Sequence, residues 1–368
     1  MSGANIHQVL EEYVATHPDS TDPTHLAQVI RDNHRGVISD GEVFEILRTF
    51  RQESTGFGVL EELLHIPGVS DIVVNGTKGV FIDRGQGLER CATEFTEDAQ
   101  VRRLATRLIV AAGRRLDDSQ CFADGKIARD HGVTVRVHAI LAPPAQQTCI
   151  SLRILGTAHA RLADLVSAGT MSKATAAGLK ELVHTQVPLL IIGGTGSGKT
   201  TLLSALLEEV PAEQRIIAIE DTAELAPLHP HFVSMISRPP NVEGQGAISL
   251  ADLLQQSLRM RPNRIVVGEI RGKEIVELLS AMNTGHEGCA GTMHANTLKD
   301  VLARIAALGA LGGMPKDAVY AQVAAAAPMV LVMARGQRGR YLKEIGRLTG
   351  SPVAMQQLWS HEQGDFQP

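Results

Sequence analysis

Residues 188–200, Pro-Leu-Leu-Ile-Ile-Gly-Gly-Thr-Gly-Ser-Gly-Lys-Thr, combine a short apolar run with a glycine-rich loop. The run at 188–192 is uninterrupted and short, as is typical of a parallel strand buried on both faces. The loop has the spacing GxxxxGK[ST], and residues 201–209 predict a helix directly after it. A strand, this loop and a helix in that order predict a phosphate-binding loop.

The loop residues have distinct expected roles. Glycines let successive backbone N–H groups turn toward phosphate oxygens, and the following helix N-terminus favours negative charge. We expect Lys199 to reach the β- and γ-phosphates of ATP and the Thr200 hydroxyl to bind Mg²⁺. The expected nucleotide-binding residues are Gly193, Gly194, Thr195, Gly196, Ser197, Gly198, Lys199, Thr200 and Thr201.

The pattern around the loop is one of alternating strands and helices. Further apolar runs at 215–219, 264–267 and 329–333 predict parallel strands, and residues 250–258 carry the apolar stripe of a helix. Such alternation predicts an α/β domain whose parallel sheet is covered on both faces. Before it, residues 70–83 predict a hairpin, residues 100–112 a helix, and residues 134–141 and 148–154 two strands.

Acidic side chains follow two of the predicted strands. Glu220, Asp221 and Glu224 follow the run at 215–219, and Glu269 follows the run at 264–267. Carboxylates at the C-terminal ends of parallel strands face the ligand crevice. We therefore expect Glu269 to orient or polarise an attacking water. Glu220, Asp221 and Glu224 are expected to hold Mg²⁺-bound waters or to share that task.

Two histidines lie in a glycine-rich stretch at 284–296. A metal site would need more ligands at suitable spacing. His294 is instead expected to contact a γ-phosphate or its water, so that the ATP and ADP states differ there. His286 and Arg271 are expected at a sensor or subunit interface.

Length and composition set the wider limits. Of the 368 residues 44% are hydrophobic and only 20% are charged, which excludes a largely disordered chain. Only 3% are aromatic, so the core is expected to be aliphatic. We expect a helical segment at 1–55, an α/β domain at 56–155, a linker at 156–172 and an ATPase domain at 173–368. The net charge of −5 lies entirely in residues 1–155, which argues against a nucleic-acid coat protein.

Four isolated cysteines, the lack of an N-terminal signal pattern and the lack of a long apolar run fit a reducing cytoplasm. Residues 335–340, Arg-Gly-Gln-Arg-Gly-Arg, predict an exposed hairpin turn, and contact of Arg338 and Arg340 with anionic lipid is the alternative.

Four boxes occur in a fixed order: GGTGSGKTTL, IEDTAEL, the stretch RPPNVEGQGAISLADLLQQSLRMRPNRIVVGEIRG, and TGHEGCAGTMHAN. Together they resemble the type II/type IV secretion ATPase superfamily, and most of all its tight-adherence (Flp-type) pilus assembly and conjugal-transfer-associated members. The resemblance implies a smaller N-terminal α/β domain and a RecA-like C-terminal domain. It also implies a cytoplasmic homohexamer that uses ATP and Mg²⁺ to drive pilus assembly or secretion through an inner-membrane platform protein.

The resemblance also assigns residues, including two arginines of the N-terminal domain that contact the γ-phosphate. Arg136 and Arg153 match those positions, and an arginine fork suits developing phosphoryl charge. The remaining implied residues are Lys199, Thr200, Glu220, Asp221, Glu224, Glu269, His286 and His294. Three departures stand out: a glycine precedes Glu269, residues 120–126 follow the family pattern loosely, and residues 1–55 follow none.

Other functions remain open on the same loop. A nucleic-acid-translocating or DNA-transfer ATPase would show DNA-stimulated hydrolysis, but few aromatic residues are available for base stacking. A small-molecule kinase would need an arginine-rich lid, and a GTPase would need an NKxD motif, and neither pattern is present. A scaffold that only binds nucleotide would not need the acidic residues.

Overall fold

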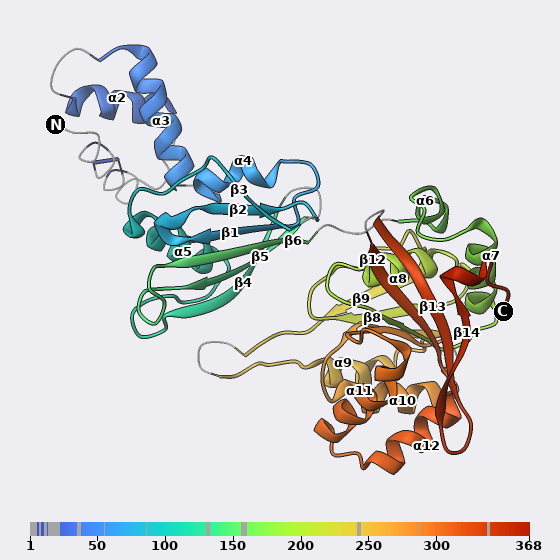
Figure 1. Ribbon diagram of the computed structural model, residues 1–368. Coiled ribbons are helices and arrows are strands. Elements are labelled where there is room, and N and C mark those ends of the chain that lie inside the picture. Colours follow the sequence, from blue (N-terminus) through green and yellow to red (C-terminus); the bar gives the residue numbers. More distant parts are fainter. Residues whose placement is uncertain are drawn as a thin grey trace. The chain divides into compact units, whose positions relative to one another are not determined.

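The computed structural model (Figure 1) describes residues 6, 9–10, 13, 23–34, 38–54, 56–85, 87–129, 133–155, 160–240, 244–286, 288–336 and 339–368. The chain divides into two compact units, Met1–Leu155 and Gly156–Pro368. Each unit has its own hydrophobic core and is described by itself.

The N-terminal part of the first unit is helical where it is described. Helices α2 (Pro23–Asn33) and α3 (Asp40–Ser54) pack around a small core to which Leu10, Ile30 and Phe50 contribute. Ser39 begins α3 with a reciprocal cap, because its backbone N–H and hydroxyl both donate to Glu42 Oε2.

The rest of the first unit is an antiparallel sheet in the order β3-β2-β1-β6-β5-β4. Its strands are β1 (Asp71–Asn75), β2 (Val80–Asp83), β3 (Leu88–Arg90), β4 (Phe122–Ala128), β5 (Thr134–Ile140) and β6 (Cys149–Leu155). The helices beside it are η1 (Gly58–Leu60), α4 (Glu61–Leu64), η2 (Gly76–Lys78) and α5 (Asp98–Ala111). The predicted hairpin, helix and two strands are all present, and strands β3 and β4 were not predicted.

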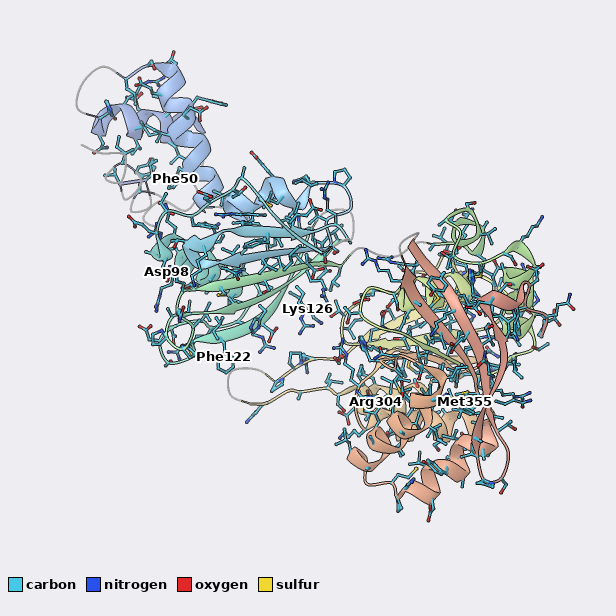
Figure 2. All side chains as sticks on the ribbon, in the orientation of Figure 1. Phe50, Asp98, Phe122, Lys126, Arg304 and Met355 are labelled. Carbon is cyan, nitrogen blue, oxygen red and sulfur yellow. The ribbon has the colours of Figure 1, made fainter. Side chains whose placement is uncertain are left out.

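Helix α5 covers one face of this sheet. Its residues Val101, Leu104 and Leu108 are buried with alternate residues of β5 and β6. Asp98, labelled in Figure 2, ties the helix start to the sheet, because its carboxylate accepts hydrogen bonds from the Thr148 N–H at 2.7 Å and hydroxyl at 2.9 Å.

The second unit is built on an eight-stranded sheet in the order β14-β13-β12-β7-β11-β10-β8-β9. The six strands from β12 to β9 run parallel, and β13 and β14 extend the sheet as antiparallel strands. The strands are β7 (Leu189–Ile192), β8 (Ile216–Glu220), β9 (Phe232–Ile236), β10 (Arg264–Ile270), β11 (Ala290–Met293), β12 (Met329–Gly336), β13 (Gly339–Thr349) and β14 (Ala354–Ser360).

Both faces of this sheet are covered, as the alternation of strands and helices predicts. On one face the core includes α6 (Leu162–Ser167), α7 (Lys173–His184) and α8 (Lys199–Glu208). The core on the other face includes α9 (Leu250–Ser257), α10 (Glu274–Asn283), α11 (Leu298–Leu311) and α12 (Lys316–Ala326). Strand β7 shows the division, since Leu189 and Ile191 face the first set and Leu190 and Ile192 the second.

The expected linker at 156–172 differs from the structure over most of its length. Residues 156–159 lie outside the described residues. From Ala160 onward the chain belongs to the second unit, because Leu162, Leu165 and Met171 are buried in the core of that unit. Helix α6 has only six residues, too few for a repeating apolar pattern to be recognised in the sequence.

Within the described ranges, no helix has both the length and the apolar character needed to cross a membrane.

Candidate nucleotide site

The loop between β7 and α8 has a backbone that only glycine adopts easily. The φ angles of Gly193, Gly196 and Gly198 are +151°, +71° and +94°. A Cβ on Gly193 would lie only 2.3 Å from the carbonyl oxygen of Met333 on the neighbouring strand β12. The glycines are therefore required by close packing as well as by the turn, and Thr195 and Gly196 are left exposed at its tip.

The interior of the loop holds one cation and one unsatisfied hydroxyl. Lys199 is buried, and its Nζ donates to the carbonyl oxygens of Gly193 and Gly194 at 3.0 Å each. Burial lowers the pKa of Lys199. Ser197 Oγ is buried and has no hydrogen-bond partner within the described part of the chain. A cradle of glycine backbone, a lysine and an orphan hydroxyl at a helix start fits a polyphosphate group.

Glu269 lies at an irregularity in strand β10. Val267 pairs with Gly291 and Ile270 with Met293, so β10 has one more residue than β11 between these pairs. Such a β-bulge re-aims a side chain. The Thr292 hydroxyl donates to the Gly268 carbonyl at 2.6 Å, which satisfies a backbone group inside the bulge.

Glu269 stands between two partners. Its Oε1 lies 2.8 Å from His294 Nε2, and its Oε2 accepts a hydrogen bond from Arg271 Nη2 at 2.5 Å. Burial alone would raise the pKa of Glu269, but the Arg271 hydrogen bond and the charges of Arg271 and Lys199 lower it below the ordinary value. Glu269 is therefore a carboxylate at neutral pH.

His294 is neutral under the same conditions. Burial and the charge of Lys199 lower the pKa of His294 and outweigh the charge of Glu269, which raises it. Arg271 and Arg304, which lies on α11 (Figure 2), lower it further by smaller amounts. The two side chains lie close but not at hydrogen-bond angles, because Glu269 Oε1 has no hydrogen-bond partner among the described residues. A small rotation that let the neutral imidazole donate to this carboxylate would place its proton on Nε2. Nδ1 is then a hydrogen-bond acceptor.

Glu220 orders the acidic loop that follows β8. It is only 3% exposed, and its Oε1 accepts hydrogen bonds from the backbone N–H groups of Glu224 and Leu225 at 3.1 Å each. The glycine before Glu269 makes room for it, since a Cβ on Gly268 would lie 2.7 Å from Glu220 Cγ. The departure from the family pattern thus has a packing reason.

Three other side chains have the oxygen atoms that Mg²⁺ prefers. The Thr200 hydroxyl lies in the first turn of α8, and Asp221 and Glu224 lie in the loop after β8. Asp221 also accepts a hydrogen bond from the Ser237 hydroxyl at 2.7 Å. Among the described residues no cluster of three or more acidic, histidine or cysteine side chains could hold a metal alone. This set fits a cation that is held mainly by phosphates, a hydroxyl and water.

The two histidines of the stretch 284–296 lie at opposite edges of the sheet. Strand β11 runs parallel to β7, so His294 follows it on the edge of the phosphate loop and His286 precedes it on the other edge. His286 Nδ1 is buried and lacks a hydrogen-bond partner within the described residues. Its expected interface role stays a prediction.

Arg136 and Arg153 belong to the first unit and lie directly opposite each other on β5 and β6. Both are on the exposed face, where Arg136 contacts Asp124 at 3.5 Å and Arg153 donates to Asp71 at 2.8 Å. Their expected contact with a γ-phosphate stays a prediction.

The sequence marks Gly268 only as a departure from the family pattern and does not mark Thr292 at all. The supporting role of each could not be predicted, because each acts through a neighbouring strand.

Comparison with known proteins shows the family of the chain. The family described as "Type II/IV secretion system protein" matches residues 53–336, and the chain belongs to it. A Mycobacterium tuberculosis protein named "Putative conjugal transfer protein" is 47% identical over 334 residues, which cover 89% of this chain and 95% of that protein. The type IV secretion system protein VirB11 of Bartonella henselae is 45% identical over 121 residues, 32% of this chain and 33% of its own length.

The fold also matches a solved structure. The pilus retraction motor PilT with bound ADP has a TM-score of 0.56 and 20% identity, over 83% of this chain and 84% of that one. The predicted fold class, an α/β protein with a RecA-like domain, is confirmed.

Proposed function

We propose that the chain is an ATP hydrolase that binds ATP and Mg²⁺ at the loop 193–201. The observation that carries the proposal is Glu269, an ionised carboxylate that its partners hold at the sheet edge of the phosphate loop. A fixed carboxylate at this edge can orient a water toward a γ-phosphate.

The residues around Glu269 have separate proposed roles in binding the nucleotide and the cation. Lys199 exchanges the carbonyls of Gly193 and Gly194 for phosphate oxygens, and the loop N–H groups hold the same chain of phosphates. Neutral His294 lies against the Glu269 carboxylate and presents Nδ1 as an acceptor for a water beside the γ-phosphate, a water that would be present with ATP and absent with ADP. Mg²⁺ at Thr200, Asp221 and Glu224, partly through water, would neutralise phosphate charge.

The first unit is proposed to supply Arg136 and Arg153 to the γ-phosphate. Both are exposed and share one face of the sheet. Phosphate would replace the present partners, Asp124 and Asp71. Exposed ion pairs of this kind cost little to exchange, roughly 0–1 kcal/mol each.

The variant Glu269→Gln tests the proposed chemistry. It keeps the size of the side chain but cannot act as a carboxylate, so we expect turnover to fall about 10²-fold or more with nucleotide binding retained. Phosphate release and nucleotide affinity are the measurements. Glu362→Gln, in the exposed turn 361–363, is the matched control and should change neither. Unchanged turnover in Glu269→Gln would refute the assignment.

At the level of biology, we propose a homohexameric motor for pilus assembly or secretion, located in the cytoplasm and attached to the inner membrane through a platform protein. Family membership and the similarity to VirB11 support this role. The test is co-purification from membranes with the ATP-loaded Glu269→Gln variant, in which we expect an inner-membrane protein.

The names of the relatives keep one alternative open. A conjugal transfer role is compatible with an ATPase that moves DNA. That function predicts DNA-stimulated hydrolysis and recovery of DNA without a membrane partner, and either result would favour it over the pilus or secretion role.

A further inference from the structure

The hairpin formed by β12 and β13 borders the phosphate loop on the side away from Glu269. Strand β7 lies between β11 and β12 in the sheet. β12 pairs Val332 with Ile192, the last residue of β7, and then continues to Gly336 beside the loop. Strands β10 and β11, which lead to Glu269 and His294, therefore flank the loop on one side and this hairpin flanks it on the other.

Two arginines of the hairpin reach the loop. Arg335 Nη1 lies 3.9 Å from the position of a Cβ on Gly196, and Arg340 Cδ lies 3.1 Å from the position of a Cβ on Gly198. Both arginines are exposed, and neither forms an ion pair or a hydrogen bond with any residue that the structure describes.

The two arginines also repel each other. Arg335 and Arg340 are direct partners in the antiparallel register, so their side chains leave the same face of the hairpin. Like charges at directly opposite positions destabilise a strand pair. The two arginines lie beside a loop whose glycines and Lys199 fit a polyphosphate. A phosphate group bound in that loop would therefore neutralise the charge of both arginines.

We propose that Arg335 and Arg340 bind the α-phosphate side of the nucleotide, an inference that rests on the proposed binding of ATP at this loop. Glu269 and His294 lie on the β10–β11 side, which assigns the γ-phosphate to that side. The polyphosphate then extends across the loop toward β12 and β13. Planar guanidinium groups bind phosphate oxygens in pairs and hold them more firmly than a single point charge does.

This placement has a specific consequence, because the α-phosphate is common to ATP and ADP. Replacing either arginine by glutamine, Arg335→Gln or Arg340→Gln, should weaken ADP and ATP to the same extent, by about tenfold each. Affinities are measured by titration with ADP and with a non-hydrolysable ATP analogue.

Lys343→Gln is the matched control, since Lys343 lies on the same strand but has its own ion pair with Glu344 at 3.3 Å. It should leave both affinities unchanged. A second readout separates binding from a structural role. Without nucleotide, Arg340→Gln removes the repulsion and should keep or raise the midpoint of thermal unfolding.

Three results would overturn the proposal: unchanged affinity for both nucleotides, loss of affinity for ATP alone, or a lower unfolding midpoint without nucleotide. Failure of the proposed function is distinguishable from these. A chain that binds ADP through the arginines but shows no phosphate release would refute hydrolysis and leave this inference intact.

Discussion

The variant Gly268→Ala tests the packing that sets the acidic loop against Glu269. A Cβ at this position would lie 2.7 Å from Glu220 Cγ and 3.0 Å from Glu220 Oε1, whereas ordinary contact begins at 3.4 Å. Glu220 would have to move by about 0.7 Å to restore contact distance, and burial leaves it no open side.

The expected loss of stability follows from the two backbone N–H groups that Glu220 binds. Its Oε1 accepts hydrogen bonds from the Glu224 and Leu225 backbone N–H groups at 3.1 Å, near the upper end of the ordinary range, so a further shift would weaken both. Overpacking and strain on two hydrogen bonds to a buried carboxyl group together predict a loss of about 2–4 kcal/mol in unfolding free energy.

The assay uses the only tryptophan of the chain. Trp359 is buried on β14, and its Nε1 donates to the Gly364 carbonyl at 2.9 Å, so its fluorescence reports on the second unit. Urea unfolding followed by this signal gives the free energy of each variant.

A double-mutant cycle identifies the cause. In a Glu220→Ala background the clashing atoms are absent, so Gly268→Ala should cost less than half of its value in the unaltered chain. An equal cost in both backgrounds would refute the reasoning, because the strain would then come from the bulge itself and not from Glu220.

Two further predictions concern the surroundings of Glu269. Thr292→Val keeps the shape of the side chain but leaves the Gly268 carbonyl without its hydrogen bond. It should lower turnover by loosening the bulge and cost about 1–3 kcal/mol in unfolding free energy, whereas unchanged turnover would show that the hydroxyl does not position Glu269. Arg271→Gln removes the hydrogen bond that, with nearby charges, lowers the pKa of Glu269, so that burial dominates and the pKa rises. Glu269 is then protonated at a higher pH, and the acid limb of the turnover–pH profile should shift upward; a profile that does not move would contradict the electrostatic account.

The position of much of the candidate site could be predicted from sequence, because its residues lie in short continuous stretches. The phosphate loop fixes its glycines, Lys199 and Thr200 within eight consecutive residues. The positions of Glu220 and Glu269 could also be predicted, because parallel strands place their C-terminal residues at the same edge of the sheet. The parallel strands themselves are apolar on both faces and therefore stand out as continuous runs.

Strand β4 shows why other elements could not be predicted. Its outward residues Asp124 and Lys126 are charged, and Gly125 interrupts its inner face. That glycine is required because a Cβ there would lie 2.4 Å from the Ala112 Cβ at the end of α5. A glycine in a strand usually weakens the prediction, and only the packed helix reveals its purpose.

The place of the two arginines of the β12–β13 hairpin could not be predicted either, because it depends on the order of the strands in the sheet. Seen only as sequence, residues 335–340 are a basic turn more than 130 positions from the loop, with solvent or lipid as the natural partner. The strand order places β12 directly beside β7, and the register then places Arg335 and Arg340 against Gly196 and Gly198. The loop thus has a carboxylate on one flank and, on the other, two arginines that have no ion pair with any residue the structure describes. On the proposed function, these opposite charges would give a bound polyphosphate a direction: the end that water attacks would face the carboxylate, and the other end would face the two arginines.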